Sequence, residues 1–361
     1  MSSPPRKHLT GFLALYGALA VCLLGTAGLV WAVDPLQVFR RASFYEPIIE
    51  SDERTQNAGL LRSYPAQGLL IGSSLSQACR ADDFTKALGT DFLRISAAGM
   101  TAKEWRYFLE TRIMRRKPAR VVDIQYWFTF GRTNAMDFRE EYGAFPTHLY
   151  QPGALDIAKY LINYDNIGMA INVLAEAAGF SAIERIDFQS RNSPEADPRR
   201  TTGVASVRRL YNQIAGGRKP DAAFLAAERN RMLAAFDEFY APFILDHQEI
   251  QFDIVVPPFT LAYYQAFKSA GVYRLNTILL FRQKLAELAR EAPNVRIHDF
   301  GVDDRFLSDY DNFYDTHHFS ATICARIADD IAAKPAGDGA EAVIEGTQRL
   351  KALVDDAELP W

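Results

Sequence analysis

The stretch Gly68-Leu69-Leu70-Ile71-Gly72-Ser73-Ser74-Leu75-Ser76 decides how we interpret the fold of this 361-residue chain. Its apolar run is short, continuous and aliphatic, which is typical of a strand buried on both faces of a parallel sheet. The run stops at a glycine followed by two serines, which predicts a tight turn that opens a helix. The stretch therefore predicts a serine, Ser74, at the carboxyl end of a strand and at the start of a helix.

A second stretch, Asp315-Thr316-His317-His318-Phe319-Ser320, places a carboxylate and an imidazole on one short loop. The serine hydroxyl is a weak nucleophile at its ordinary pKa, so it needs a base, and the base needs an orienting group. The three-residue offset lets the carboxylate of Asp315 fold back onto the imidazole of His318. We therefore predict Ser74 as nucleophile, His318 as general base and Asp315 as the group that orients the base.

Each of these assignments has a competing neighbour. Ser73 and Ser76 flank the predicted nucleophile, and serines in this position can also do no more than cap a helix. His317 competes with His318 for the role of base. Asp315, His317 and His318 could instead hold a metal ion, but the other histidines are scattered along the sequence. We expect neither a metal nor a cofactor.

Four further apolar runs complete the predicted strands: Phe92–Ser96, Arg120–Tyr126, Phe252–Val256 and Val295–Asp299. Helical patterns lie between them, and the clearest starts at the capping box Thr101-Ala102-Lys103-Glu104. The alternation predicts an α/β fold with a doubly wound, parallel, five-stranded sheet. In such a sheet, chemistry lies at the carboxyl ends of the strands, where Ser74 and the loop of His318 can meet.

The segment 129–221 does not fit a minimal sheet of this kind. We expect it to be an insertion or cap near the mouth of the site, with a helix over Leu155–Ala178. Its second half is polar and could equally be a surface loop. The sheet domain as a whole is expected over 61–333, followed by a peripheral segment at 334–361.

The N-terminal segment 9–33 is apolar and uncharged. It exceeds the roughly 20 residues that cross a bilayer, and basic residues precede it, which favours a cytoplasmic N-terminus at 1–8. We predict a single-pass anchor in a bacterial inner membrane, a linker at 34–60, and the bulk of the chain in the periplasm or another extracytoplasmic space. The alternative is a cleaved signal sequence, for which Gly25-Thr26-Ala27 is a passable cleavage site.

Charge and composition narrow the class of partner. With 48% hydrophobic residues the chain can bury a sizeable core. Its formal net charge is −4, and acidic and basic residues are mixed along the sequence. The chain therefore offers no basic field of the kind that binds nucleic acid.

Two cysteines, Cys79 and Cys324, each follow one half of the predicted site by a few residues. In an oxidising compartment they could form a disulfide that joins the two halves. Two buried free thiols is the interpretation that we favour from sequence.

These residues resemble the SGNH, or GDSL-type, hydrolase superfamily. Gly72–Leu75 matches its first block, with serine where the family usually has aspartate; Gly99 matches the second block, and Asp315-x-x-His318 the last. The third block departs, because the usual Gly-x-Asn-Asp is replaced by Gln125-Tyr126-Trp127-Phe128. The resemblance implies an SGNH-like sheet and a Ser-His-Asp centre over about residues 60–330.

The resemblance also implies an oxyanion hole. The asparagine of the missing block normally donates there, so the backbone N–H groups of Ser74 and Gly99 are the expected remaining donors. Either Gln125 or another group substitutes for the asparagine, or the enzyme is slow toward water. The aromatic run of Tyr126, Trp127 and Phe128 would suit stacking against a sugar substrate, and we expect at least one of the three to pack in the core instead.

The membrane anchor and the altered third block point to a narrower branch. They resemble anchored SGNH-like proteins that modify cell-envelope polymers, such as the alginate acetylation proteins and the DltD-type teichoic acid D-alanylation proteins. The likeness implies O-acylation of a polysaccharide or related polymer through an acyl-serine, beside a multispanning membrane-bound O-acyltransferase. Two alternatives stay open: an esterase or deacetylase with the same three residues, and a non-catalytic assembly factor.

Overall fold

A computed structural model describes residues 6–45, 53–141, 143–180, 201–217, 219–270, 272–356 and 358–361. The chain forms two compact units. The first comprises the described residues within Met1–Tyr64 and Pro146–Arg185, and the second those within Pro65–Phe145 and Ile186–Trp361.

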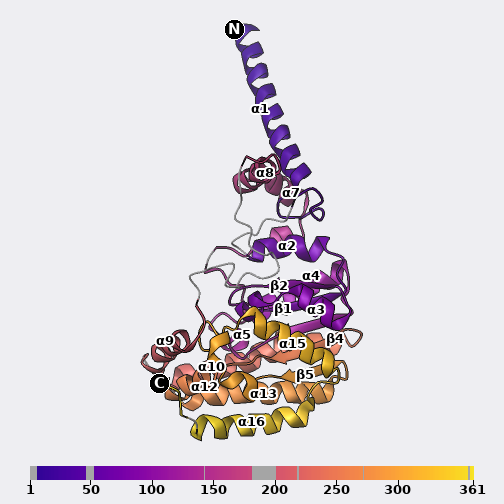
Figure 1. Ribbon diagram of the computed structural model, residues 1–361. Helices are drawn as coiled ribbons and strands as arrows, with labels where there is room; N and C mark the ends of the chain where they lie inside the picture. The colour runs from indigo at the N-terminus through magenta and orange to yellow at the C-terminus, as the bar shows by residue number, and fades with distance from the viewer. Residues whose placement is uncertain are drawn as a thin grey trace. The chain divides into compact units, whose positions relative to one another are not determined.

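The second unit is built on a five-stranded sheet in which every pairing is parallel (Figure 1). Its strands are β1 (Gly68–Gly72), β2 (Phe92–Ser96), β3 (Arg120–Ile124), β4 (Gln251–Val256) and β5 (Val295–Asp299), in the order β2-β1-β3-β4-β5. The predicted α/β class and five-stranded parallel sheet are confirmed. The third strand ends two residues earlier than predicted, because Trp127 already has helical backbone angles.

The strand order reverses between β1 and β3, and ligands bind at such switch points in open α/β sheets. Gly72, the last residue of β1, pairs with Ser96 on one side and with Ile124 on the other. A Cβ atom at Gly72 would lie 2.8 Å from the carbonyl oxygen of Ile124. The glycine therefore lets β1 end tightly against β3, directly before the serines.

Helices follow the strands in the second unit: η1 (Ser74–Ala78), α3 (Ala81–Leu88), α4 (Ala102–Arg115), α5 (Phe128–Gly131), α9 (Val204–Ala215), α10 (Ala222–Ala235), η2 (Phe236–Tyr240), α11 (Ala241–Asp246), α12 (Leu261–Ala270), α13 (Val272–Glu291), α14 (Asp304–Leu307), η3 (Tyr310–Asn312), α15 (Ala321–Ala333) and α16 (Gly339–Asp356). The predicted capping box at Thr101 is present at the start of α4. All five residues of β1 are buried, so both faces of the sheet are covered.

The predicted peripheral segment 334–361 contains α16, which packs against α13 and β5. Val343 and Leu350 of this helix are fully buried. A buried ion pair between Arg282 of α13 and Asp299 of β5 is joined by a hydrogen bond from Arg282 to Thr347 of α16. The helix is therefore tied into the core of the second unit.

The first unit consists of α1 (Arg6–Val33), α2 (Glu53–Ser63), α6 (Thr147–Tyr150), α7 (Ala154–Leu161) and α8 (Tyr164–Ala177). The prediction of a single helix over Leu155–Ala178 was wrong. Its two parts are separated at Ile162 and Asn163, and the Asn163 side chain caps α8 by accepting from two backbone N–H groups. Residues 146–180 thus form a unit with the N-terminal helix, which differs from the domain boundaries expected from sequence.

Helix α1 is long and apolar enough over Thr10–Val33 to cross a membrane. Only 6% of its most apolar window is buried within the protein. A helix of this kind near the N-terminus can be a membrane anchor or a signal sequence.

Candidate active site

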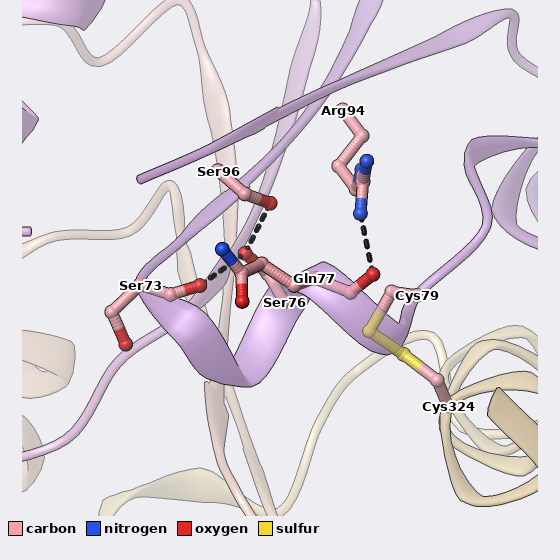
Figure 2. The surroundings of a disulfide bond; sticks show 7 residues. All are labelled: Ser73, Ser76, Gln77, Cys79, Arg94, Ser96 and Cys324. Atoms are coloured by element: carbon pink, nitrogen blue, oxygen red, sulfur yellow. Dashed lines mark hydrogen bonds between the residues drawn. A yellow bond between two sulfur atoms is a disulfide. The ribbon is translucent and has the colours of Figure 1, made fainter. Parts of the chain in front are cut away.

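The three serines after β1 have different surroundings. Ser76 is buried; its hydroxyl donates to the carbonyl oxygen of Ser73 and lies 2.7 Å from the hydroxyl of Ser96 (Figure 2). Ser73 is also buried, and it precedes η1 in an extended conformation. Ser74, the first residue of η1, is the serine whose hydroxyl meets a histidine.

The predicted nucleophile, base and orienting group form one hydrogen-bonded chain. The Ser74 Oγ atom lies 2.9 Å from His318 Nε2, and His318 Nδ1 lies 2.7 Å from Asp315 Oδ2. An ionised carboxylate can only accept, so His318 donates from Nδ1. Its Nε2 lone pair then faces the Ser74 hydroxyl, in the tautomer that a general base requires.

The loop that carries His318 is held by hydrogen bonds between the Asp315 carboxylate and the loop's own backbone. Asp315 Oδ1 accepts from the backbone N–H groups of His317 and His318, each at 2.8 Å. The buried residues Phe313 and Phe319 form an antiparallel bridge at the base of the loop. The carboxylate therefore holds the loop with one oxygen and the imidazole with the other.

A second loop supports the first from the end of β4. Thr260, four residues after the strand, donates to the carbonyl oxygen of Thr316 from its hydroxyl at 2.8 Å and from its backbone N–H at 3.1 Å. Both threonines are fully buried. We did not predict this support from sequence, since a lone threonine after Pro257-Pro258 carries no distinctive signal.

His317, the competing candidate for the base, lies in surroundings that disfavour its charged form. Burial by itself would raise the pKa of Asp315. The attraction of His317 and His318 in their protonated forms and the hydrogen bonds from both residues outweigh burial, and the pKa of Asp315 is held well below its ordinary value. Burial lowers the pKa of His317 to about 4, and its ring packs against Phe259 and Tyr263. His317 is therefore neutral near pH 7 and turned into an aromatic cluster.

The same loop satisfies the geometry of a metal site. Asp315, His317 and His318 offer ligand atoms that all lie within 4.8 Å of one another. A metal bound to His318 would compete with Ser74 or Asp315, because both of its ring nitrogens already have hydrogen-bond partners. The hydrogen-bonded arrangement therefore favours acid–base chemistry over coordination.

Gly99, the predicted oxyanion residue, is held by two arginines that we did not predict from sequence. Its φ of +57° lies in the left-handed region that favours glycine. Arg132 donates to the carbonyl oxygen of Gly99, and Arg139 donates to that of Ala98 at 2.7 Å. A Cβ atom at Gly99 would overlap both guanidinium groups.

The aromatic residues after β3 lie in different surroundings, some in the core and some beside the candidate site. Trp127 is 1% exposed, and its indole N–H donates to the Tyr263 hydroxyl at 2.9 Å. The expected contact with a sugar is therefore not available to Trp127 in this conformation. Tyr126 instead lies beside Ser73 and Arg132, and burial raises the pKa of its hydroxyl to about 12.

Gln125, the expected substitute for the missing asparagine, is fully buried. Its side chain lies beside the carboxyl of Asp123, whose pKa burial raises to about 7. Asp123 also accepts a hydrogen bond from Tyr240 at 2.8 Å. Gln125 thus belongs to an interior polar cluster, and no surface of it is open to a substrate.

Cys79 and Cys324 form a disulfide, with their Cα atoms 5.2 Å apart (Figure 2). The favoured interpretation of two free thiols was wrong. Cys79 directly follows η1 and Cys324 lies in the first turn of α15, so the bond joins the element that starts with Ser74 to the helix that follows His318. This proximity could not be seen in the sequence, where 245 residues separate the two cysteines.

No protein-family model matches the chain, and no curated protein matches its sequence. The functional assignment therefore rests on the geometry of the site and on the sequence motifs.

Proposed function

We propose that this protein is a serine-dependent O-acyltransferase that works at a membrane surface. The observation that carries the proposal is the hydrogen-bonded chain from Ser74 through His318 to Asp315. This is the arrangement that activates a serine hydroxyl for attack on an acyl carbonyl. Its position after β1, at the switch point of a parallel sheet, supports the same conclusion.

The reaction would proceed in two balanced halves. Ser74 Oγ attacks the carbonyl carbon of an acyl donor while its proton passes to His318 Nε2, and the tetrahedral intermediate then expels the donor's alcohol or thiol, which takes that proton. An acceptor hydroxyl next gives its proton to His318 and attacks the acyl-serine ester. The intermediate collapses, and Ser74 regains the proton as the acyl group leaves on the acceptor.

The oxyanion of each intermediate needs donors. We assign this role to the backbone N–H groups of Ser74 and Gly99. Gln125 has no exposed surface, so the site has one fewer donor than a site with an asparagine in that place. Losing one such donor costs about 3 kcal/mol in transition-state stabilisation, which is consistent with an enzyme that is slow toward water.

The acceptor that we propose is a polysaccharide or related envelope polymer outside the cytoplasm, and the acyl group is an acetyl group. The acyl donor would come from a multispanning membrane-bound O-acyltransferase. The support for this environment is α1, which is long and apolar enough to cross a membrane, together with the motifs that resemble the SGNH-like envelope proteins; the bacterial inner membrane is part of the proposal. Hydrolysis by the same three residues is the alternative activity, and an assembly role without catalysis is the alternative to both.

A covalent probe tests the proposal. The full chain in detergent is exposed to a fluorophosphonate, and its intact mass is compared with those of Ser74→Ala and His318→Ala. One adduct on the wild type, absent from both variants, supports an activated serine; no adduct on a folded wild type would overturn it in favour of an assembly role. Incubation with p-nitrophenyl acetate and oligosaccharides then separates transfer from hydrolysis, because only transfer yields acetylated sugar.

A further inference from the structure

The first unit carries an exposed apolar surface next to the helix that can span a membrane. It is formed by α7 and α8, both of which contact α1 (Figure 1). Along α1 the residues from Thr10 to Gly25 are exposed, whereas Val30 and Val33 are buried. Helices α7 and α8 therefore cover the C-terminal end of α1 and leave the rest of its apolar surface free.

This contact is fixed by polar bonds at the end of α1. Asp34 is buried and accepts from three backbone N–H groups that follow it. Tyr160 of α7 donates from its hydroxyl to Asp34 Oδ1 at 2.9 Å. The hydrogen bond therefore fixes α7 next to the C-terminal end of α1.

Helix α8 has three strips along its length, as expected for 100° per residue. One strip is buried and contains Asn166, Ala170 and Val173. A second strip is polar and contains Asp165, Asn172 and Glu176. The third contains Tyr164, Ile171 and Leu174, which are 86%, 52% and 40% exposed. Exposing the apolar side chains of this third strip to water does not stabilise the fold.

Helix α7 and its end continue the same pattern. Leu155 is 78% exposed and Ile162 is 50% exposed, and they are seven residues apart, so they lie on one side. We call Leu155, Ile162, Tyr164, Ile171 and Leu174 the apolar surface of the first unit.

The length of α1 places this surface relative to a bilayer. Its 24-residue span extends about 36 Å at 1.5 Å per residue, which exceeds a hydrocarbon core of about 30 Å. One end of an untilted helix of this length therefore lies in the interfacial layer. Trp31, an exposed residue of the type found at that layer, marks the end that α7 and α8 cover.

We propose that α7 and α8 are a second membrane contact, which inserts the apolar surface into the interfacial layer of the bilayer that α1 spans. The occupant of the surface is lipid. Helices α7 and α8 contact α1, whose own apolar side chains from Phe12 to Leu24 are exposed, and the polar strip of α8 offers a boundary toward water. The first unit would then be attached to the bilayer at two places, through the spanning helix α1 and through α7 and α8 in the interfacial layer. This proposal does not depend on the proposed acyl transfer.

Spin labels test this proposal in the full chain. A Cys22→Ser background leaves the disulfide intact and removes the free cysteine. Single cysteines replace Ile171, its polar neighbour Asn172, or Leu13 as a reference inside the bilayer, and the labelled proteins are reconstituted into phosphatidylcholine–phosphatidylglycerol vesicles. Power saturation then compares collisions with oxygen, which concentrates in lipid, and with a water-soluble nickel chelate.

We expect the oxygen-to-nickel ratio at position 171 to approach that at position 13 and to exceed that at position 172 several-fold. Equal ratios at 171 and 172 would overturn the proposal. Protection of position 171 from both reagents would also overturn it, since this would mean that protein covers the surface. If cleavage of the N-terminal segment removed the label at position 13, the mature protein would have no spanning helix α1. This outcome would also overturn the proposal.

Discussion

The Ser74 hydroxyl and the His318 imidazole lie within hydrogen-bonding distance, 2.9 Å, although 244 residues separate them in the sequence. The parallel sheet brings them together, because all of its strands end at the same edge. Ser74 follows the first strand and His318 lies in the loop that follows the last one. Substitutions around this contact can test whether it performs chemistry and what holds it in place.

Asp315→Asn should slow fluorophosphonate labelling while leaving the fold intact. The amide can still accept from the backbone with its oxygen, but its NH₂ group cannot accept from His318 Nδ1. The wrong imidazole tautomer then faces Ser74, and such changes cost up to about 10⁴-fold in rate in a comparable triad. The measurement is the labelling rate by intact mass, with Asp311→Asn, an exposed carboxylate of the same segment, as the matched control. Equal rates in the two variants would contradict an orienting role for Asp315.

A chelator should leave the labelling rate unchanged. Asp315 and His318 act through hydrogen bonds in the proposed mechanism, and no step requires coordination. The full chain is incubated with EDTA, and labelling is followed with and without added Zn²⁺. A rate that falls with EDTA and returns with zinc would favour a metal held by Asp315, His317 and His318.

His317 should make the protein less stable in mild acid. Burial lowers its pKa to about 4 in the folded state, whereas the unfolded value is about 6.5. Between these values the unfolded chain binds more protons, so the free energy of unfolding rises with pH from 4 to 6.5 and levels off above it. The expected gain is on the order of 3 kcal/mol.

Urea unfolding of His317→Phe measures this contribution. The phenyl ring suits the contacts with Phe259 and Tyr263, and the slope between pH 4 and 6.5 should flatten. His148→Phe, at an exposed histidine, should retain the slope of the wild type. If the two variants behave alike, His317 does not carry the pH dependence.

Loss of the disulfide should affect both stability and the site. Cys79→Ser with Cys324→Ser removes a covalent link between the region of η1 and α15, and removing such a bond commonly costs about 2–5 kcal/mol. We also expect slower fluorophosphonate labelling, because the bond joins the segments that carry Ser74 and His318. Cys22→Ser, at the free cysteine, is the control and should change neither quantity.

Gly99→Ala should impair labelling more than a comparable substitution elsewhere. Both Gly99 and Gly89 have positive φ, so alanine at either position costs about 1–2 kcal/mol in backbone strain. At Gly89 no atom lies within 4 Å of the new Cβ, whereas at Gly99 it displaces Arg132 and Arg139. A labelling rate that falls only in Gly99→Ala would locate the effect at the site, and equal rates would assign it to backbone strain alone.

Local signals in the sequence were sufficient for the sheet and for the three central residues. The runs at β1 to β5 are continuous and apolar, and the Asp315-x-x-His318 spacing fits one loop. Contacts between distant segments were harder to predict. The bond between Cys79 and Cys324 and the support from Thr260 depend on which strand ends become neighbours, which no local pattern records.

Other predictions failed or stayed ambiguous because the residue type suits two different structural roles. Trp127 suits either a sugar site or a core, and its hydrogen bond to Tyr263 is visible only in three dimensions. Asn163 interrupts an apolar helical pattern because its side chain can cap a new helix. In both cases the surroundings, rather than the residue type, decided the outcome.

The disulfide affects what happens to the covalent connectivity of the chain after a single backbone cut. A protease that cuts the backbone once between Cys79 and His318 would leave two polypeptides joined through the Cys79–Cys324 disulfide, with Ser74 on one and His318 on the other. The nicked molecule would keep its mass apart from one added water, and reduction would release both pieces. The nucleophile and its base could thus belong to two separate polypeptides and still share one molecule.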